Sequence, residues 1–144
     1  MNWKKYGLAV VVTFVSMFLL GFLLHGVLLG ATYKMAPAGM LRAEPRIPYI
    51  ALGYLLFAMA ACWVYAYGVE NKPWLGQGVR YGLALAAMGA FMPNFVGFAV
   101  APWPREIAIR ATLADFVIML VAGVCIAGIY RGSAGIPRSS GASA

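Results

Sequence analysis

The sequence predicts an all-α protein in which a single domain forms a four-helix transmembrane bundle, and three observations support this fold class. Of the 144 residues, 63% are hydrophobic and 10% are charged, whereas soluble domains carry roughly a quarter charged residues and about half apolar ones. The chain contains four long apolar runs, and a helix needs about 20 apolar residues to cross a bilayer. A polar, turn-rich stretch at 68–82, GVENKPWLGQGVRYG, divides these runs into two helical hairpins and is predicted to be the hinge between them.

The first predicted span covers residues 7–31 and follows a short basic start. Its apolar run is longer than the core of a secretory signal peptide, which has about 7–15 residues, so we interpret it as a membrane span. A loop is expected at 32–47. The second span is predicted at 48–67, because Pro48 suits a first helical turn and Trp63 near the other end is typical of an aromatic belt at a membrane boundary.

The third span is predicted at 79–100 and contains Pro93. Proline removes a backbone hydrogen bond, so we expect a kink at this point. The fourth span is predicted at 109–130. Residues 1–131 therefore form the transmembrane domain, and the small, polar residues of 132–144 form a low-complexity C-terminal tail.

Basic residues indicate the orientation of the spans. The net charge is +7, and the basic residues lie between the apolar runs, where they face lipid headgroups rather than nucleic acid. An even number of spans places both termini and the hinge on one side. That side has Lys4, Lys5, Lys72, Arg80, Arg131 and Arg138, and the other has Lys34, Arg42, Arg46, Arg105 and Arg110. The small excess predicts cytoplasmic termini.

Four polar residues, one in each span, form a predicted polar layer: His25, Tyr54, Asn94 and Asp115. Each lies six residues from its span end on the side opposite the termini, which is a depth of about 9 Å. Polar groups in lipid are costly and usually face the bundle interior. The layer is interpreted either as a structural clasp, with Asp115 paired to His25 or to an interfacial arginine, or as a site for a small ligand, a lipid or quinone headgroup, or a proton, in which His25 and Asp115 titrate.

No cofactor or metal is expected, although lipid or quinone contact fits the polar layer. His25 is the single histidine, so a haem would need a different second ligand. Cys62 and Cys125 lie in apolar runs without the close spacing of a metal site or a disulfide framework. We interpret both cysteines as packing residues.

Two glycine steps, Gly26-x3-Gly30 and Gly78-x3-Gly82, are predicted to allow close approach of helices. A weak internal repeat is also visible. The segment FLLHGV at 22–27 resembles FMPNFV at 91–96, which aligns His25 with Asn94.

The hinge sequence KPWLGQGVRYG, together with HGVLLGATY after the first span, resembles a set of small bacterial inner-membrane proteins of unassigned function. These are four-span proteins of similar size with a Lys/Arg-Pro-Trp-x-Gly-Gln-Gly turn, and the resemblance covers most of 1–131. It implies a multi-pass protein of the bacterial inner membrane. It implies no substrate, cofactor or catalytic residue.

The sequence therefore predicts an accessory or structural subunit of a larger inner-membrane complex, for example a respiratory or photosynthetic one. Its expected partners are membrane lipids and the helices of other membrane subunits. The segments outside the spans are short, and no phosphate-binding, zinc-protease or nucleophile-elbow motif is present, so we predict that the protein is not an enzyme. The alternative is a small transporter or ligand-binding membrane protein that uses the polar layer.

Overall fold

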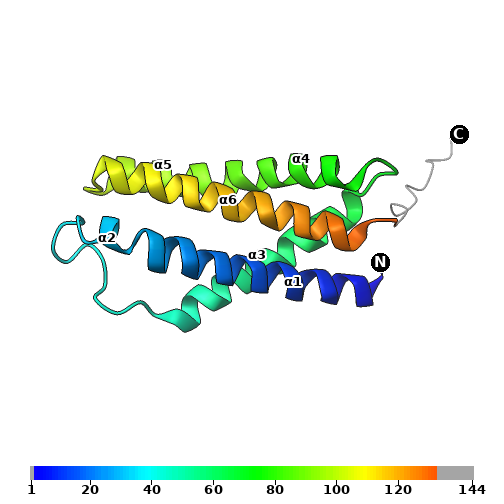
Figure 1. The fold of residues 1–144 in the computed structure, drawn as a ribbon, viewed down its shortest axis with the longest axis horizontal. Coiled ribbons are helices and arrows are strands. Elements are labelled where there is room, and N and C mark those ends of the chain that lie inside the picture. The colour runs from blue at the N-terminus through cyan, green and yellow to red at the C-terminus, as the bar shows by residue number, and fades with distance from the viewer. Residues whose placement is uncertain (1, 133–144) are drawn as a thin grey trace, which may run out of the picture.

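The computed structural model describes residues 2–132, and within this range the chain is helical and has no strand (Figure 1). The elements are α1 (Trp3–Gly21), η1 (Phe22–Leu28), α2 (Gly30–Tyr33), α3 (Ile47–Gly68), α4 (Trp74–Ala86), η2 (Ala87–Phe91), α5 (Met92–Val100) and α6 (Arg105–Tyr130), where η1 and η2 are π-helical. Four continuous helices, Trp3–Leu28, Ile47–Gly68, Trp74–Val100 and Arg105–Tyr130, are long and apolar enough to cross a membrane. The predicted all-α four-helix bundle is confirmed. Arg138 and all of the predicted tail but its first residue lie outside the described residues.

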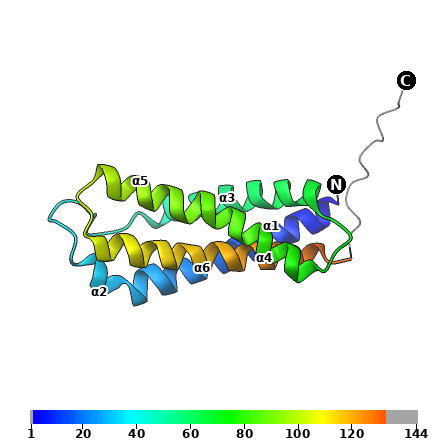
Figure 2. The same ribbon diagram turned by 90° about the horizontal axis from the view of Figure 1, so that it is seen from above.

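The four helices run back and forth along one long axis (Figures 1 and 2). The start of α1, the α3–α4 hinge and the end of α6 lie at one end, which we call the hinge end. The loops that follow α2 and α5 lie at the opposite end, which we call the loop end. Helix α6 packs most extensively, against α4 and α1, and α1 also packs against α3. Helix α6 is therefore the central helix of the bundle.

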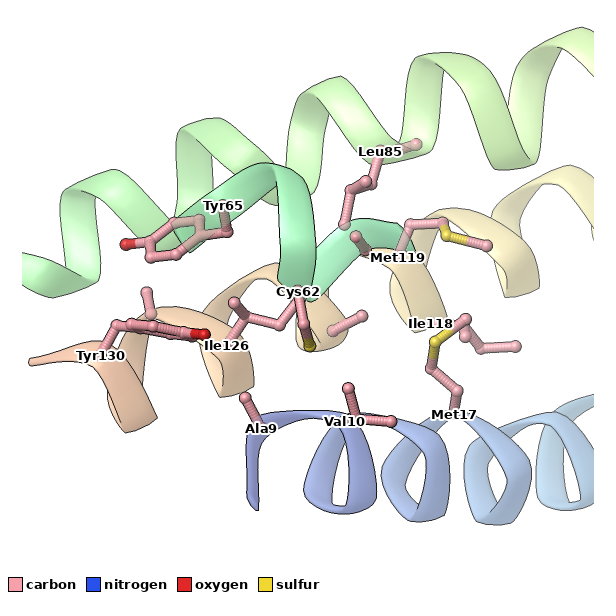
Figure 3. Close-up of a cluster of buried hydrophobic side chains, with 14 of the residues drawn as sticks. Ala9, Val10, Met17, Cys62, Tyr65, Leu85, Ile118, Met119, Ile126 and Tyr130 are labelled. Atoms are coloured by element: carbon pink, nitrogen blue, oxygen red, sulfur yellow. The ribbon is translucent and has the colours of Figure 1, made fainter. Parts of the chain in front are cut away.

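The apolar core lies toward the hinge end. Figure 3 shows side chains from all four spans that meet around α6: Ala9, Val10, Met17, Cys62, Tyr65, Leu85, Ile118, Met119, Ile126 and Tyr130. Many of the other core residues are alanines, whose small side chains let membrane helices approach closely. This half of the molecule therefore has the dense packing of a protein interior.

The first half of α3 is much less packed than the second half. None of residues 47–57 is buried, and the buried positions of this helix begin at Ala58. In Figure 1, this half of α3 lies away from α5. The bundle is thus closely packed at the hinge end and divergent at the loop end.

Helix α3 begins at Ile47, one residue before its predicted start, whereas the other three spans begin four or five residues earlier than the apolar runs predicted. Helix α1 begins at Trp3 instead of residue 7, because the Asn2 side chain accepts a hydrogen bond from the backbone nitrogen of Lys5 at 3.1 Å. Helix α4 begins at Trp74 instead of residue 79, and α6 begins at Arg105 instead of residue 109. Each follows a proline, at 73 and 104, and the polar first turns of these helices hide their starts from a search for apolar residues.

The hinge is shorter than the predicted stretch of 68–82, and the Gln77 side chain closes it. The Gln77 amide nitrogen donates to the carbonyl oxygens of Glu70 at 2.8 Å and Lys72 at 2.9 Å. Its amide oxygen accepts from the backbone nitrogen of Glu70 at 2.9 Å. The non-helical segment is thereby limited to about five residues between α3 and α4.

Candidate functional site

Four polar side chains from different parts of the chain meet in one network, which we call the Asp115 cluster. Asp115 of α6 accepts a hydrogen bond from Asn94, with 2.7 Å between Nδ2 and Oδ2. Its other oxygen, Oδ1, lies 3.0 Å from Nε2 of His25. The second ring nitrogen of His25, Nδ1, lies 2.5 Å from the hydroxyl oxygen of Tyr33. The cluster therefore joins the first, third and fourth spans.

The two residues that bind Asp115 are each associated with a π-helical segment. His25 lies inside η1, where the backbone nitrogen of Leu29 donates to the carbonyl of Leu24. Asn94 follows η2, where the backbone nitrogen of Met92 donates to Ala87. These wider turns change the direction of the side chains that follow and are frequent at functional sites.

The second of these segments has a physical cause in the sequence. Pro93 has no backbone N–H, so it cannot continue the α-helical ladder, and the π-helical turn lies directly before it. The amide nitrogen of Asn94 also donates to the carbonyl of Ala90 at 2.8 Å. The predicted irregularity at Pro93 thus takes the form of a π-helical turn, and Asn94 bonds both to that turn and to Asp115.

Tyr33 is a cluster residue that the sequence analysis missed. The predicted loop of 32–47 included it, whereas in the structure the helix resumes at Gly30 and ends at Tyr33. Its ring stacks against the His25 ring, with 6.0 Å between the centroids. The separation of eight residues, about two helical turns, was a usable indication that both side chains face the same way.

Tyr33 adds a phenol hydroxyl to the cluster. Burial, followed by the charge of Asp115 and the nearby Tyr54, raises the pKa of Tyr33 to about 12. The phenol is therefore protonated at neutral pH and can donate to Nδ1 of a neutral His25. A neutral His25 then carries its hydrogen on Nε2 and donates it to Asp115.

The cluster is satisfied from within the chain. Both oxygens of Asp115 and both ring nitrogens of His25 have partners. Asn94 is 5% exposed, whereas the side chains of His25 and Asp115 are 25% and 22% exposed. The geometry is that of a structural clasp, and one edge of it remains accessible.

Tyr54 does not join the hydrogen-bonded network. Its hydroxyl packs closely against the backbone of Gly21, where a Cβ atom would clash with it. No hydrogen bond of the Tyr54 side chain occurs within residues 2–132. Three of the four residues of the predicted polar layer therefore come together, and Tyr54 lies beside them as a packing residue.

The interfacial arginine nearest in sequence binds elsewhere. Arg110 donates to the hydroxyl of Thr32 at 3.0 Å and lies 3.8 Å from the Glu106 carboxylate. Of the two partners considered for Asp115, the structure shows His25. Arg110 instead ties the start of α6 to α2.

The two Gly-x3-Gly steps differ in how closely another helix approaches them. A Cβ atom at Gly78 would lie 2.8 Å from the Cβ of Ala127, and one at Gly82 would lie 2.9 Å from the backbone of Leu120. Gly26 is exposed, and nothing lies within 4 Å of a Cβ at Gly30. Close helix contact is thus made by Gly78 and Gly82 against α6, while Gly26 and Gly30 take no part in it.

The cysteines contact hydroxyl groups of α1. The Cys62 sulfur lies 3.8 Å from the hydroxyl of Thr13, and the Cys125 sulfur lies 3.8 Å from that of Ser16. Both thiols are free. Within residues 2–132, no group of three or more histidine, cysteine or acidic side chains could hold a metal ion.

Comparison of the chain with protein-family models, with curated proteins and with solved structures finds no match. The resemblance in the hinge sequence therefore stays a prediction.

Proposed function

We propose that the protein is an accessory or structural subunit of a larger complex in a bacterial inner membrane, such as a respiratory or photosynthetic complex. The observation that supports this proposal most directly is the packing of α3. Over residues 47–57 no side chain is buried, although this segment includes large apolar residues such as Tyr49, Leu52 and Leu56. A half-span that packs against α1 through Tyr54 but buries none of its residues offers surface to the helix of another subunit, since membrane helices associate through side-chain packing.

The Asp115 cluster has a structural role in this proposal. It ties the first, third and fourth spans through hydrogen bonds to both oxygens of Asp115. Such bonds hold helices together where few alternative partners exist. The three clasped spans form a stable unit, and the first half of α3 is left to contact a partner.

The test is native mass spectrometry of the protein extracted gently from its own membrane. We expect a complex of fixed stoichiometry with larger chains. A photo-crosslinking residue at Leu52 should capture the same partner, whereas one at Leu8 on the exposed face of α1 is the matched control and should not. A lone monomer or homodimer, or equal capture at both positions, would overturn the proposal.

We also propose that both termini are cytoplasmic. The described residues at the hinge end are Lys4, Lys5, Lys72, Arg80 and Arg131, and those at the loop end are Lys34, Arg42, Arg46, Arg105 and Arg110. Arg138, outside the described residues, supplies the small excess that supports this orientation. Reporter fusions after residue 131 and within the loop at 34–46 test it, and activity of a periplasmic reporter at the first position would reverse it.

One observation favours a second function, that of a small transporter or ligand-binding protein. The side chains of His25 and Asp115 are about one quarter exposed, and ionisable residues within spans often mark transport pathways. In this case the protein would purify alone or as a homo-oligomer. Asp115→Asn would abolish transport in proteoliposomes while the variant remained folded by circular dichroism. Unchanged transport in that variant would remove the second function.

A further inference from the structure

A groove between α5 and α6 at the loop end is separate from the Asp115 cluster. Its cavity measures about 390 Å³ and is lined mainly by Phe95 and Phe98 of α5 and by Arg105, Ile109 and Leu113 of α6. This volume lies in the range of small-molecule sites, roughly 300–1,000 Å³. The groove is therefore large enough to hold part of an amphiphilic molecule.

Arg105 provides the charged end of this groove. It is the first residue of α6 and therefore lies near the membrane surface. Within residues 2–132 its guanidinium has no hydrogen-bond or ion-pair partner, in contrast to Arg110, which binds Thr32 and Glu106. A free guanidinium can pair with both oxygens of a phosphate group.

The remainder of the groove is apolar. Ile109 and Leu113 follow Arg105 at intervals of four residues, about 6 Å and 12 Å deeper along the same helix face, and Phe95 and Phe98 line the other side. Thr112 also contributes to the lining, but its hydroxyl donates to the carbonyl of Ala108 at 2.7 Å. Arg105 is thus the one charged side chain in the lining of the groove.

We propose that this groove binds one anionic phospholipid, whose phosphate pairs with Arg105 and one of whose acyl chains lies along Ile109 and Leu113. The charge complementarity at the surface and the apolar walls below it both match this occupant. A soluble anion would gain nothing from those walls, and a sugar or nucleotide would find no further hydrogen-bond partners there. The inference does not depend on the proposed subunit function.

The experiment measures lipid binding by native mass spectrometry of the full chain in a neutral detergent. The probes are palmitoyl-oleoyl-phosphatidylglycerol, the matching phosphatidylcholine, dihexanoyl-phosphatidylglycerol and inorganic phosphate. We expect one long-chain phosphatidylglycerol to stay bound. The phosphatidylcholine should bind more weakly, and neither the short-chain lipid nor phosphate should displace the long-chain anionic lipid.

Two variants, each with a matched control, separate the contribution of the charge from that of the apolar walls. Arg105→Gln should weaken binding about tenfold, because one charge-assisted pair is lost, while Arg42→Gln removes a charge from the same end of the molecule and should leave affinity unchanged. Ile109→Trp fills the groove and should also weaken binding, whereas Val117→Trp, on an exposed position outside the groove, should not. Circular dichroism confirms that each variant is folded.

Three results would overturn the proposal. Equal losses in Arg105→Gln and Arg42→Gln would indicate a diffuse charge effect. Displacement of the lipid by inorganic phosphate would indicate a simple anion site. Unchanged binding in folded Ile109→Trp would show that the acyl chain does not occupy the groove.

Discussion

The Nε2 atom of His25 lies 3.0 Å from Oδ1 of Asp115, although 90 residues separate them in the chain. Asn94 donates to the other oxygen of the same carboxylate at 2.7 Å. Asp115 thereby accepts from both residues that the internal repeat aligns, one in each half of the chain. The carboxylate joins the two helical hairpins by hydrogen bonds, as do the bond from Arg110 to Thr32 and the bond from the Tyr81 hydroxyl to the carbonyl of Ala61.

Removal of this carboxylate should destabilise the bundle. Asp115→Ala leaves Nε2 of His25 and Nδ2 of Asn94 without their common acceptor. Hydrogen bonds between membrane helices contribute about 0.6–2 kcal/mol each, and an unpaired buried donor adds a further cost. We expect the free energy of unfolding to fall by about 1–3 kcal/mol, measured by titration with sodium dodecyl sulfate in mixed micelles.

A double-mutant cycle separates the pair interaction from a general loss of packing. His25→Ala and Asp115→Ala should be strongly non-additive, because either change removes the same bond. The control cycle pairs His25→Ala with Glu106→Ala, since Glu106 is exposed and bonds to Arg110 instead. Additive effects in the first cycle would contradict the hydrogen bond between His25 and Asp115.

The raised pKa of Tyr33 predicts that the folded protein loses stability at alkaline pH. Its pKa is raised to about 12 in the folded protein, mainly by burial, from an ordinary value near 10. Between these values the folded state holds a proton that the unfolded state has released. The contribution of Tyr33 is therefore complete below about pH 10 and is lost as the pH rises toward 12.

The measurement for Tyr33 is the unfolding free energy between pH 9 and pH 12 in the same micelles, at roughly half-unit steps. In Tyr33→Phe the alkaline decline should be shallower than in the unmodified chain. Tyr49→Phe removes an exposed phenol at the start of α3 and is the matched control. Identical pH profiles for the chain with and without Tyr33 would rule out this role of the phenol.

Hydrophobicity was sufficient to predict the features that depend on the length of the apolar runs and on the depth of polar residues within them. Four runs of apolar residues gave the four spans, and a common depth brought together His25, Asn94 and Asp115. Tyr33 was missed because it lies just past the apolar run, where a π-helical turn and a short helix carry it back to His25. Neither feature follows from hydrophobicity.

The pattern of apolar residues also did not predict local hydrogen bonds or close contacts between helix backbones. The first residues of α1, α4 and α6 are Trp3, Trp74 and Arg105, and they follow an asparagine cap or a proline. The extent of an apolar run does not show where these helices begin. In the structure Gly123 of the fourth span packs against Gly82 of α4, but the other glycine of that span, Gly128, is five residues away, so the sequence has no Gly-x3-Gly step there. The role of Gly123 depends on which face of α4 it meets, which is a property of the folded bundle.

The hinge prediction concerns Gln77. Its amide makes three hydrogen bonds to the backbone of Glu70 and Lys72, so Gln77→Ala should release the turn between α3 and α4. We expect hydrogen–deuterium exchange at 69–73 to be faster by about tenfold or more, because all three hydrogen bonds are lost, while exchange in α6 is unchanged. Arg80→Ala is the control, because among residues 2–132 Arg80 bonds to the carbonyl of Gly76 within its own helix and to no group of the hinge.

An unchanged exchange rate at 69–73 in Gln77→Ala would show that the hinge holds its form without this side chain. Gln77→Glu refines the test. It keeps an acceptor for the backbone nitrogen of Glu70 and removes both donated bonds, so its exchange rate should fall between those of the unmodified chain and Gln77→Ala.

Gly123 of α6 meets the backbone of Gly82 of α4 in a close contact between the two helices. A Cβ atom at Gly123 would lie 2.5 Å from the Cα of Gly82 and 2.6 Å from the carbonyl oxygen of Gly78. These are backbone atoms, so the helices themselves must separate. Gly123→Ala should therefore destabilise the bundle by about 1–3 kcal/mol, the usual range for overpacking. Gly30→Ala is the matched control, because its Cβ would meet nothing within 4 Å, and alanine in a helix is no worse than glycine. Unfolding in mixed micelles should thus separate the two variants clearly, and equal stability would contradict the close contact of α4 with α6.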